Sequence, residues 1–287
     1  MVFRQLMILG LFVLASCGAD PLVAQAPEAG EPEFAAIERR TGGRLGIALV
    51  DTGGRLLISH RPDERFAMCS TFKLPLAAML LDSSVSQRTP LLAFTRADLL
   101  ANSPYSEEVL AGSGEMRSGF AAQAIVERSD NTAANLLLRR LGGPEAFTAW
   151  LRRIGDPVTR LDRYELALNE NRPGDPRDTT SPAAMARTTA QLVYGDVLIP
   201  GYRDQLRRWT STSRTGARRI RAGLPRDWPA GDKTGSCGTA YNDIAWFETP
   251  NGLGFSLAVY LDRPTVPAAE AESAIAEVAR LIAARTR

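Results

Sequence analysis

The chain has 287 residues, 45% of them hydrophobic, which is enough to bury one large core or two smaller ones. Its formal net charge is +2, with charges of both signs spread along the sequence, which excludes the strongly basic surface of a nucleic-acid-binding protein. His60 is the only histidine, so a zinc site built on several imidazoles is excluded, and we expect His60 to lie on the surface at the end of a strand. We therefore expect no metal ion or other cofactor.

The first residues are typical of an export signal. Arg4 precedes an apolar run from Leu6 to Leu14 that is too short to cross a bilayer. The run ends in Leu14-Ala15-Ser16-Cys17-Gly18, which resembles the lipobox of bacterial lipoproteins, where the cysteine is lipidated and becomes the first residue.

Cys17 is therefore the expected lipidation site. We expect residues 1–16 to be removed and residues 17–32, rich in proline and alanine, to form a flexible tether. The protein would then be periplasmic and anchored through Cys17 to the outer membrane. Ordinary signal cleavage after Ala26, which would discard Cys17, is the alternative.

The rest of the chain has strand patterns near both ends and helical patterns between them. A helical pattern over 34–40 is followed by strands at 45–50 and 55–59. Helical patterns then cover 71–81, 121–128, 131–141, 144–154, 182–194 and 201–209. Strands return at 230–236, 243–248 and 254–261, and Pro267 opens a last helix.

This order predicts an α/β fold with one antiparallel sheet built from both ends of the chain. The terminal helices would flank the sheet, and an all-α domain would be inserted between its two halves. We place the α/β domain at 33–65 and 210–287 and the all-α domain at 66–209. A cleft between them is the natural position for a site.

Ser70 and Lys73 form the first candidate motif, at the start of the helix expected over 71–81. Residues three apart share a helix face, so the hydroxyl and the amine would lie within reach of each other. The free N–H groups at a helix start would also favour a developing negative charge. A helix cap followed by a surface lysine is the alternative, and this short motif does not decide between them.

Three more clusters fall where the cleft would lie. They are Ser129-Asp130-Asn131, Glu165 to Asn169 in the irregular segment 160–180, and Lys233-Thr234-Gly235-Ser236-Cys237. Together with Ser70-x-x-Lys73, and in this order, they resemble the class A serine β-lactamases. The resemblance covers nearly all of the chain after the signal, including Arg163 and Asp178, which match the ion pair of the family's Ω-shaped loop.

The resemblance implies hydrolysis of the β-lactam amide bond through an acyl-enzyme on Ser70. Either Lys73, if its pKa is lowered, or Glu165 acting through a water would serve as the base for acylation, and the sequence leaves both open. Glu165 would activate the deacylating water, which Asn169 would help to hold. Ser129 would pass a proton to the leaving nitrogen.

The resemblance also assigns substrate-binding residues. Backbone N–H groups of Ser70 and Ser236 would form an oxyanion hole. A cationic, hydroxyl-lined socket for the substrate carboxylate would come from Lys233, Thr234, Gly235 and Ser236, with Arg219 aligned to the arginine of carbapenem-hydrolysing members. Asn131 would bind the acylamino side chain, and Asn102 stands at the cleft gate, where the family often has an aromatic residue. We expect Asp130, Arg163 and Asp178 to be structural, and Arg214, Arg218 and Arg221 to lie on a solvated face.

Cys69 and Cys237 are the cysteines that remain once Cys17 is set aside. An exported compartment permits a disulfide, and the pair resembles the disulfide of class A carbapenemases; two free thiols are the alternative. With Ser236 and Arg219, the pair predicts hydrolysis of carbapenems in addition to penicillins and cephalosporins. Leu166 replaces a proline that some members carry after a cis peptide bond, and the state of the Glu165–Leu166 bond stays open.

Two other functions share the serine and lysine motifs. A D-alanyl-D-alanine peptidase would acylate but release penicillin slowly, and Glu165 with Asn169 argues against it. A penicillin-binding sensor domain would need a transmembrane partner segment. We expect a monomer that acts on small-molecule β-lactams and has no nucleic-acid partner.

Overall fold

The structure is a computed structural model that describes residues 32–82 and 91–286. The expected export signal and the lipidation site Cys17 lie outside these residues and stay predictions. Pro32, expected as the last residue of the tether, is instead the first residue of helix α1 (Pro32–Thr41). Among the described helices, none has both the length and the apolar character needed to cross a membrane.

A five-stranded antiparallel sheet joins the two ends of the chain. Its order is β2-β1-β9-β8-β7. The strands are β1 (Arg44–Asp51), β2 (Leu56–His60), β7 (Ala230–Ser236), β8 (Ala240–Glu248) and β9 (Gly254–Asp262). β1 pairs with β9 along its whole length, with Arg44 opposite Asp262 and Asp51 opposite Phe255. The predicted fold class is therefore confirmed.

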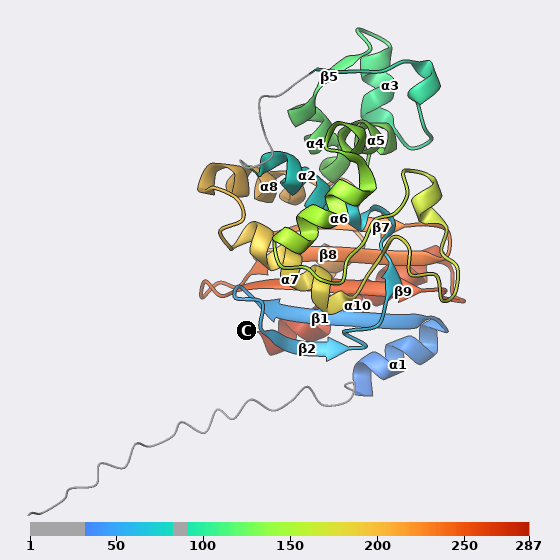
Figure 1. The fold of residues 1–287 in the computed structure, drawn as a ribbon. Helices are drawn as coiled ribbons and strands as arrows, with labels where there is room; N and C mark the ends of the chain where they lie inside the picture. The colour runs from blue at the N-terminus through green and yellow to red at the C-terminus, as the bar shows by residue number, and fades with distance from the viewer. Residues whose placement is uncertain (1–31, 83–90, 287) are drawn as a thin grey trace, which may run out of the picture.

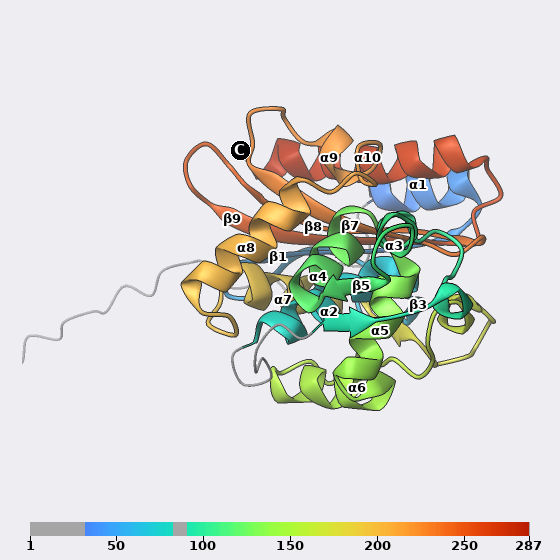
Figure 2. The ribbon, with the colours of Figure 1, turned by 90° about the horizontal axis from the view of Figure 1, so that it is seen from above.

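Helices cover both faces of this sheet. Figure 2 shows α1, α9 (Ile220–Gly223) and α10 (Ala268–Arg285) on one face, with the other helices on the opposite face. An apolar stripe of α10, with Ile275, Val278 and Ile282, packs in one buried cluster with strand residues such as Leu257 and Val259. β1 is buried along its interior because both of its faces are covered.

The remaining helices form a layer around α2 (Lys73–Leu81), every residue of which is buried. A 3₁₀ turn, η1 (Cys69–Phe72), precedes α2, so the expected helix begins two residues late. Pro75 lies in the first turn, where its missing N–H removes no helical hydrogen bond. The surrounding helices are α3 (Pro104–Leu110), α4 (Ser118–Glu127), α5 (Asn131–Arg140), α6 (Gly143–Arg153), α7 (Pro182–Val193) and α8 (Pro200–Ser211).

Short elements tie the loops together. They are β3 (Phe66–Ala67) paired with β6 (Thr179–Thr180), β4 (Leu91–Ala93) paired with β5 (Glu115–Arg117), η2 (Arg96–Asp98) and η3 (Ala167–Asn169). Figure 1 shows α3, α4 and α5 beyond the β7 edge of the sheet. The junction between this edge and the helices is where the candidate residues meet.

His60 corrects one expectation, because it is 8% exposed rather than a surface residue. Its Nε2 lies 2.6 Å from Glu38 Oε2 on α1, and its ring packs edge-on against Phe34. Helix α1 therefore covers the end of β2, which the sequence pattern predicts to be exposed.

Candidate active site

Ser70 and Lys73 meet as their spacing predicts. Ser70 lies in η1 and Lys73 is the first residue of α2. Lys73 Nζ donates a hydrogen bond of 3.0 Å to Ser70 Oγ. The surface-lysine alternative is wrong, because Lys73 is 0% exposed.

The buried amino group of Lys73 is surrounded by oxygen atoms from other parts of the chain. Its Nζ lies 2.9 Å from Glu165 Oε1, and both side chains are fully buried. It also donates to Ser129 O at 2.9 Å and to Asn131 Oδ1. Buried polar and charged groups are tolerated when they are paired and hydrogen-bonded in this way. Lys73 thus connects Ser70 to the carboxylate of Glu165.

Ser129 lies between two lysines. It follows α4 and has a φ of 57°, which turns its carbonyl oxygen toward Lys73. Its Oγ accepts a hydrogen bond of 3.0 Å from Lys233 Nζ. Burial, reinforced by the charge of Lys73, lowers the pKa of Lys233 to about 7. The hydroxyl of Ser129 therefore has a partner that can exchange a proton near neutral pH.

Asp130 and Asn131 shape the wall beside Ser129. The Asp130 carboxylate caps α5 by accepting from Ala133 N at 2.8 Å, and it accepts from Ser106 N at 2.9 Å on α3. Asn131 donates from Nδ2 to Ala101 O at 2.8 Å, and its own N–H donates to Asn102 O at 3.2 Å. Asp130 thereby holds α3 and α5 together, while Asn131 and Asn102 face the cleft.

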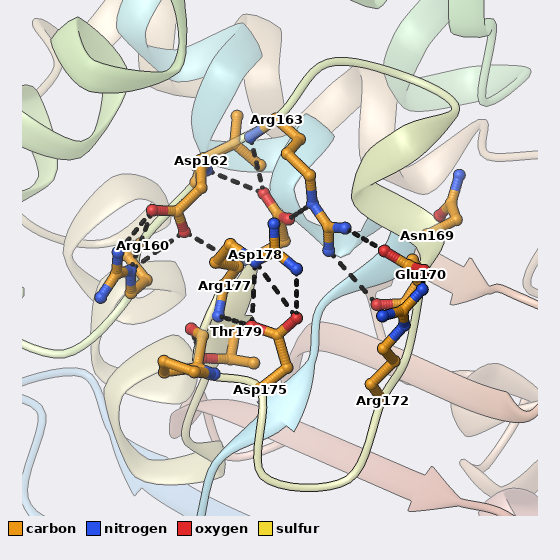
Figure 3. A network of polar contacts seen from close by, with 12 residues as sticks. Arg160, Asp162, Arg163, Asn169, Glu170, Arg172, Asp175, Arg177, Asp178 and Thr179 are labelled. Carbon is orange, nitrogen blue, oxygen red and sulfur yellow. Dashed lines mark hydrogen bonds and ion pairs between the residues drawn. The ribbon is translucent and has the colours of Figure 1, made fainter.

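The segment 160–180, which we call the Ω-loop, is held closed by ion pairs. Asp178 Oδ1 accepts from the N–H groups of Asp162 and Arg163 at 2.8 and 3.0 Å, and Asp178 Oδ2 accepts from Arg163 Nε at 2.6 Å. Arg163 also donates to Glu170 Oε2 at 2.7 Å. Figure 3 shows Arg163 reaching both Asp178 and Glu170. The expected pair Arg163–Asp178 is thus present and links the two ends of the loop.

Glu165 is positioned by amides on both sides. Asn135 of α5 donates to Glu165 O at 2.8 Å and accepts from Glu165 N at 2.9 Å. Asn169 Nδ2 donates to Glu165 Oε2 at 2.6 Å, and Asn169 Oδ1 is buried with no protein hydrogen-bond partner within the described ranges. The Glu165–Leu166 peptide bond is cis. This arrangement leaves Asn169 Oδ1 available to a water next to the carboxylate.

The turn that carries Ser70 is clamped against β7. A Cβ on Gly235 would lie 2.6 Å from Met68 O and 3.0 Å from Thr71 N, so only glycine allows this close approach. Cys69 and Cys237 form a disulfide with a Cα–Cα distance of 5.6 Å, which confirms the predicted pair. Asn242 of β8 adds a hydrogen bond of 2.9 Å to Ala67 O.

Arg219 lies behind the end of β7. Its Nη2 donates to Ser236 Oγ at 2.6 Å, and its Nη1 donates to Asn242 O at 2.7 Å. Glu272 of α10 compensates its charge at 3.2 Å. Next to this group, Thr234 Oγ1 donates to Thr215 Oγ1 at 2.7 Å. Because Ser236 Oγ accepts from Arg219, its own proton is free to be donated into the cleft.

Buried carboxylates lie on the side of β7 and β8 away from Lys233. Burial raises the pKa of Asp232 and, more strongly, that of Asp243. Asp232 Oδ2 lies 3.1 Å from Arg221 Nε, and Asp243 Oδ2 accepts from Ile220 N at 3.0 Å. This corrects the expectation for Arg221, which contacts a buried acid instead of lying on a solvated face.

These side chains border one cleft of about 540 Å³. Its lining brings together the predicted residues Ser70, Asn102, Ser129, Asn131, Asn169, Arg219, Thr234, Ser236 and Cys237. Lys73, Glu165 and Lys233 are buried beside it, and Asp130, Arg163 and Asp178 hold its walls. In the part of the chain that the structure describes, no three His, Cys, Asp or Glu side chains are grouped as a metal site would require.

Sequence reasoning missed several residues of this site. Asn135 follows Asn131 by one helical turn inside an apolar helix, a signal that could have been read as an inward-facing amide. Asn242 is a lone buried amide in a strand, and Glu272 lies on a helix far along the chain. Arg128 and Thr215 also line the cleft, and no local pattern distinguishes them.

A family model, curated relatives and solved structures that resemble this chain all describe the same kind of protein. The model of a family described as "Beta-lactamase enzyme family" matches residues 31–286. Beta-lactamase FAR-1 of Nocardia farcinica is 41% identical, over 96% of this chain and 92% of the relative. A solved structure of the class A β-lactamase of the last common ancestor of Gram-negative bacteria is 49% identical, with a TM-score of 0.85 over 89% of this chain and 98% of its own. A β-lactamase of Xanthomonas campestris is 45% identical, with a TM-score of 0.83 over 88% of this chain and 95% of its own.

Proposed function

The chain belongs to the class A β-lactamase family, and we propose that it hydrolyses its substrates through an acyl-enzyme on Ser70 and a water activated by Glu165. The observation that carries this proposal is the continuous contact from Ser70 Oγ through Lys73 Nζ to Glu165 Oε1, at 3.0 and 2.9 Å. A nucleophile and two groups that can accept a proton therefore meet at one place.

In the first step, Ser70 Oγ attacks the lactam carbonyl and its proton passes to Lys73, or through a water to Glu165. The carbon–nitrogen bond then breaks, and the nitrogen takes a proton from the hydroxyl of Ser129. Lys233, 3.0 Å from Ser129 Oγ, can replace that proton. Backbone N–H groups of Ser70 and Ser236 would stabilise the oxyanion, an effect worth about 3–4 kcal/mol per donor in other acyl-transfer enzymes.

In the second step, a water between Glu165 and Asn169 attacks the ester. By then the proton that left Ser70 has replaced the one that Ser129 and Lys233 gave to the nitrogen, so Glu165 is a carboxylate again. Glu165 accepts the proton from the water and returns a proton to Ser70 Oγ, through Lys73, when the ester bond breaks. Glu165 Oε2 already accepts from Asn169 Nδ2, and the buried Asn169 Oδ1 can accept from the same water. Glu165 and Asn169 together position the deacylating water that a slow-releasing peptidase lacks.

The test is to replace Glu165 with Gln, which keeps the shape of the side chain but removes the general base. Nitrocefin turnover and intact mass are followed together. The parent enzyme should turn over continuously, whereas E165Q should give a stoichiometric burst and a persistent adduct on Ser70. A persistent adduct on the parent enzyme would favour the peptidase or sensor alternative instead.

We further propose that carbapenems are substrates, alongside penicillins and cephalosporins. Support comes from the resemblance to disulfide-containing carbapenemases and from the Arg219–Ser236 contact of 2.6 Å, which orients the Ser236 proton toward a substrate carboxylate. Lys233 and Thr234 would complete that socket. Purified enzyme with its disulfide intact should turn over imipenem; hydrolysis of penicillins without imipenem turnover would contradict this part.

Export and lipid attachment at Cys17 are proposals that rest on the sequence alone. Cells that express the full chain should incorporate labelled fatty acid into the protein, and the Cys17→Ala variant should not. Equal labelling of both would contradict the lipoprotein assignment.

A further inference from the structure

We propose that Arg128 forms a subsite that favours cephalosporins whose C3 substituent carries a negative charge. The inference rests on the proposed function and concerns the substrate range of the same cleft. Arg128 follows the last residue of α4 and immediately precedes Ser129, and it is one of the residues that line the cleft.

Arg128 is held in one orientation by a partner on α3. Its Nη1 and Nη2 donate to Glu108 Oε2 and Oε1 at 2.8 and 2.7 Å, in the two-pronged geometry that suits a guanidinium and a carboxylate. The Arg128 side chain is 19% exposed, and that of Glu108 is 63% exposed. The guanidinium is therefore held in place by a carboxylate that itself faces water.

The lining of the cleft contains arginines but no aspartate or glutamate. Of the two arginines there, Arg219 is 5% exposed, is compensated by Glu272 and donates to main-chain carbonyls. Arg128 keeps three N–H bonds that Glu108 does not use. The hydrogen bonds from Arg128 lower the pKa of the Glu108 carboxyl most, and the charges of Arg128 and of the exposed Arg214 lower it further. Arg128 is thus the cation that a bound substrate can approach.

Nearby acids on the same side do not occupy the cleft. Asp130 is fully buried and accepts hydrogen bonds from α3 and α5. Glu127 Oε1 accepts from Gln123 and Thr212. Neither side chain lines the cleft. Glu108 is therefore the carboxylate that pairs with Arg128, and the nearby Arg214 leaves two positive charges against this one negative charge.

The chemistry of the reaction decides which part of a substrate faces Arg128. Ser129 is proposed to protonate the lactam nitrogen, which belongs to the ring fused to the lactam. In a cephalosporin this second ring bears the C3 substituent, on the side opposite the acylamino group that Asn131 would bind. The residue next to Ser129 at the wall therefore faces the C3 substituent, and a carboxylate there can accept from its free N–H groups.

The experiment compares three cephalosporins that share one acylamino side chain. Their C3 groups are a pyridinium methyl, an acetoxymethyl and a methyl thioether ending in a carboxylate. We measure kcat/KM, which reports the steps through acylation, for the parent enzyme, R128Q, R128K and E108Q, with folding checked by circular dichroism. Each value is divided by that of the neutral acetoxymethyl compound in the same variant, which removes general losses of activity.

The ratio for the anionic over the cationic compound should fall about two- to fivefold in R128Q, as expected for a contact near the surface. It should be retained in R128K and should rise in E108Q, where the competing carboxylate is gone. In the parent enzyme, 0.5 M NaCl should lower the ratio. An unchanged ratio in both R128Q and E108Q, with all three compounds hydrolysed, would overturn the subsite and leave the proposed function intact. Failure to hydrolyse any of the three would overturn the proposed function and the subsite with it.

Discussion

Replacing Asp178 with Asn tests whether the closed Ω-loop is needed for the second half of the reaction. The Asp178 carboxylate is 1% exposed and accepts from Asp162 N, Arg163 N and Arg163 Nε. Asparagine can keep an oxygen toward the two N–H groups, but its NH₂ group would then face the guanidinium, donor against donor. Breaking a buried ion pair by removing one charge costs about 3–5 kcal/mol.

The lower end of that range applies here, because Arg163 is 14% exposed and keeps its contact with Glu170. A cost of about 3 kcal/mol raises the population of the open loop by roughly a hundredfold. Glu165 and Asn169 lie in the Ω-loop, whereas Ser70, Lys73 and Ser129 do not. Deacylation should therefore decrease far more than acylation.

Stopped-flow kinetics with nitrocefin and intact mass at steady state measure the two steps separately. D178N should acylate at a rate near that of the parent enzyme and should accumulate the acyl-enzyme. The control is Arg177→Gln, which removes the exposed pair with Asp175 in the same loop and should leave both steps unchanged. If D178N lowers acylation and deacylation equally, Glu165 serves as the base in both steps. If D178N behaves like the parent enzyme, or if R177Q behaves like D178N, the loop is not held by the buried pair and the reasoning fails.

Three further predictions follow from the site. Burial lowers the pKa of Lys233 to about 7, so Lys233 loses its charge as the pH rises through 7. The value of kcat/KM for penicillins should therefore fall above pH 7, with an apparent pKa near that value. A Lys233→Arg variant should not show this fall, and a parent profile that stays flat to about pH 9 would contradict the prediction. The Cys69–Cys237 disulfide joins residues 168 positions apart and so restricts the unfolded chain. Replacing both cysteines with serine should lower the free energy of unfolding, measured by urea titration, by up to about 5 kcal/mol. An unchanged urea midpoint would exclude this contribution. Gly235→Ala would place a methyl group 2.6 Å from Met68 O, so kcat should fall at least tenfold. Gly201→Ala is the comparison, because a methyl group there meets nothing within 4 Å, and it should leave kcat unchanged.

Most of the regular elements could be predicted from the sequence, because their hydrophobic periods are strong. The strand at 230–236 and the helices starting at 131 and 182 were placed at their observed starts. The helix α3 was missed, since it is short and polar with Ser106 as its only buried residue. The two-stranded pairs β3–β6 and β4–β5 were missed as well, because each strand has only two or three residues and depends on a distant partner.

The candidate site could be predicted in its motifs but not in its supporting contacts. Ser70 and Lys73 share a helix face, so their contact follows from local geometry. The hydrogen bonds that fix Glu165 come from Asn135, which a tertiary fold alone brings to the Ω-loop. His60 and Arg221 were misplaced for the same reason, since each contacts an acid on another element, Glu38 for His60 and Asp232 for Arg221.

Several residues in and near the site adopt a backbone conformation that normally requires glycine. Cys69, Asn102, Ser129 and Asp178 all have a positive φ although none is glycine. Such conformations cost about 1–3 kcal/mol each and persist only where surrounding contacts enforce them. Here those contacts are the disulfide for Cys69, the lysine at the Ser129 carbonyl and the guanidinium at Asp178. If backbone conformation alone chose the residue, glycine would stand at these positions. The interactions that hold the nucleophile, the proton donor and the Ω-loop in place therefore also enforce the unfavourable backbone beside them.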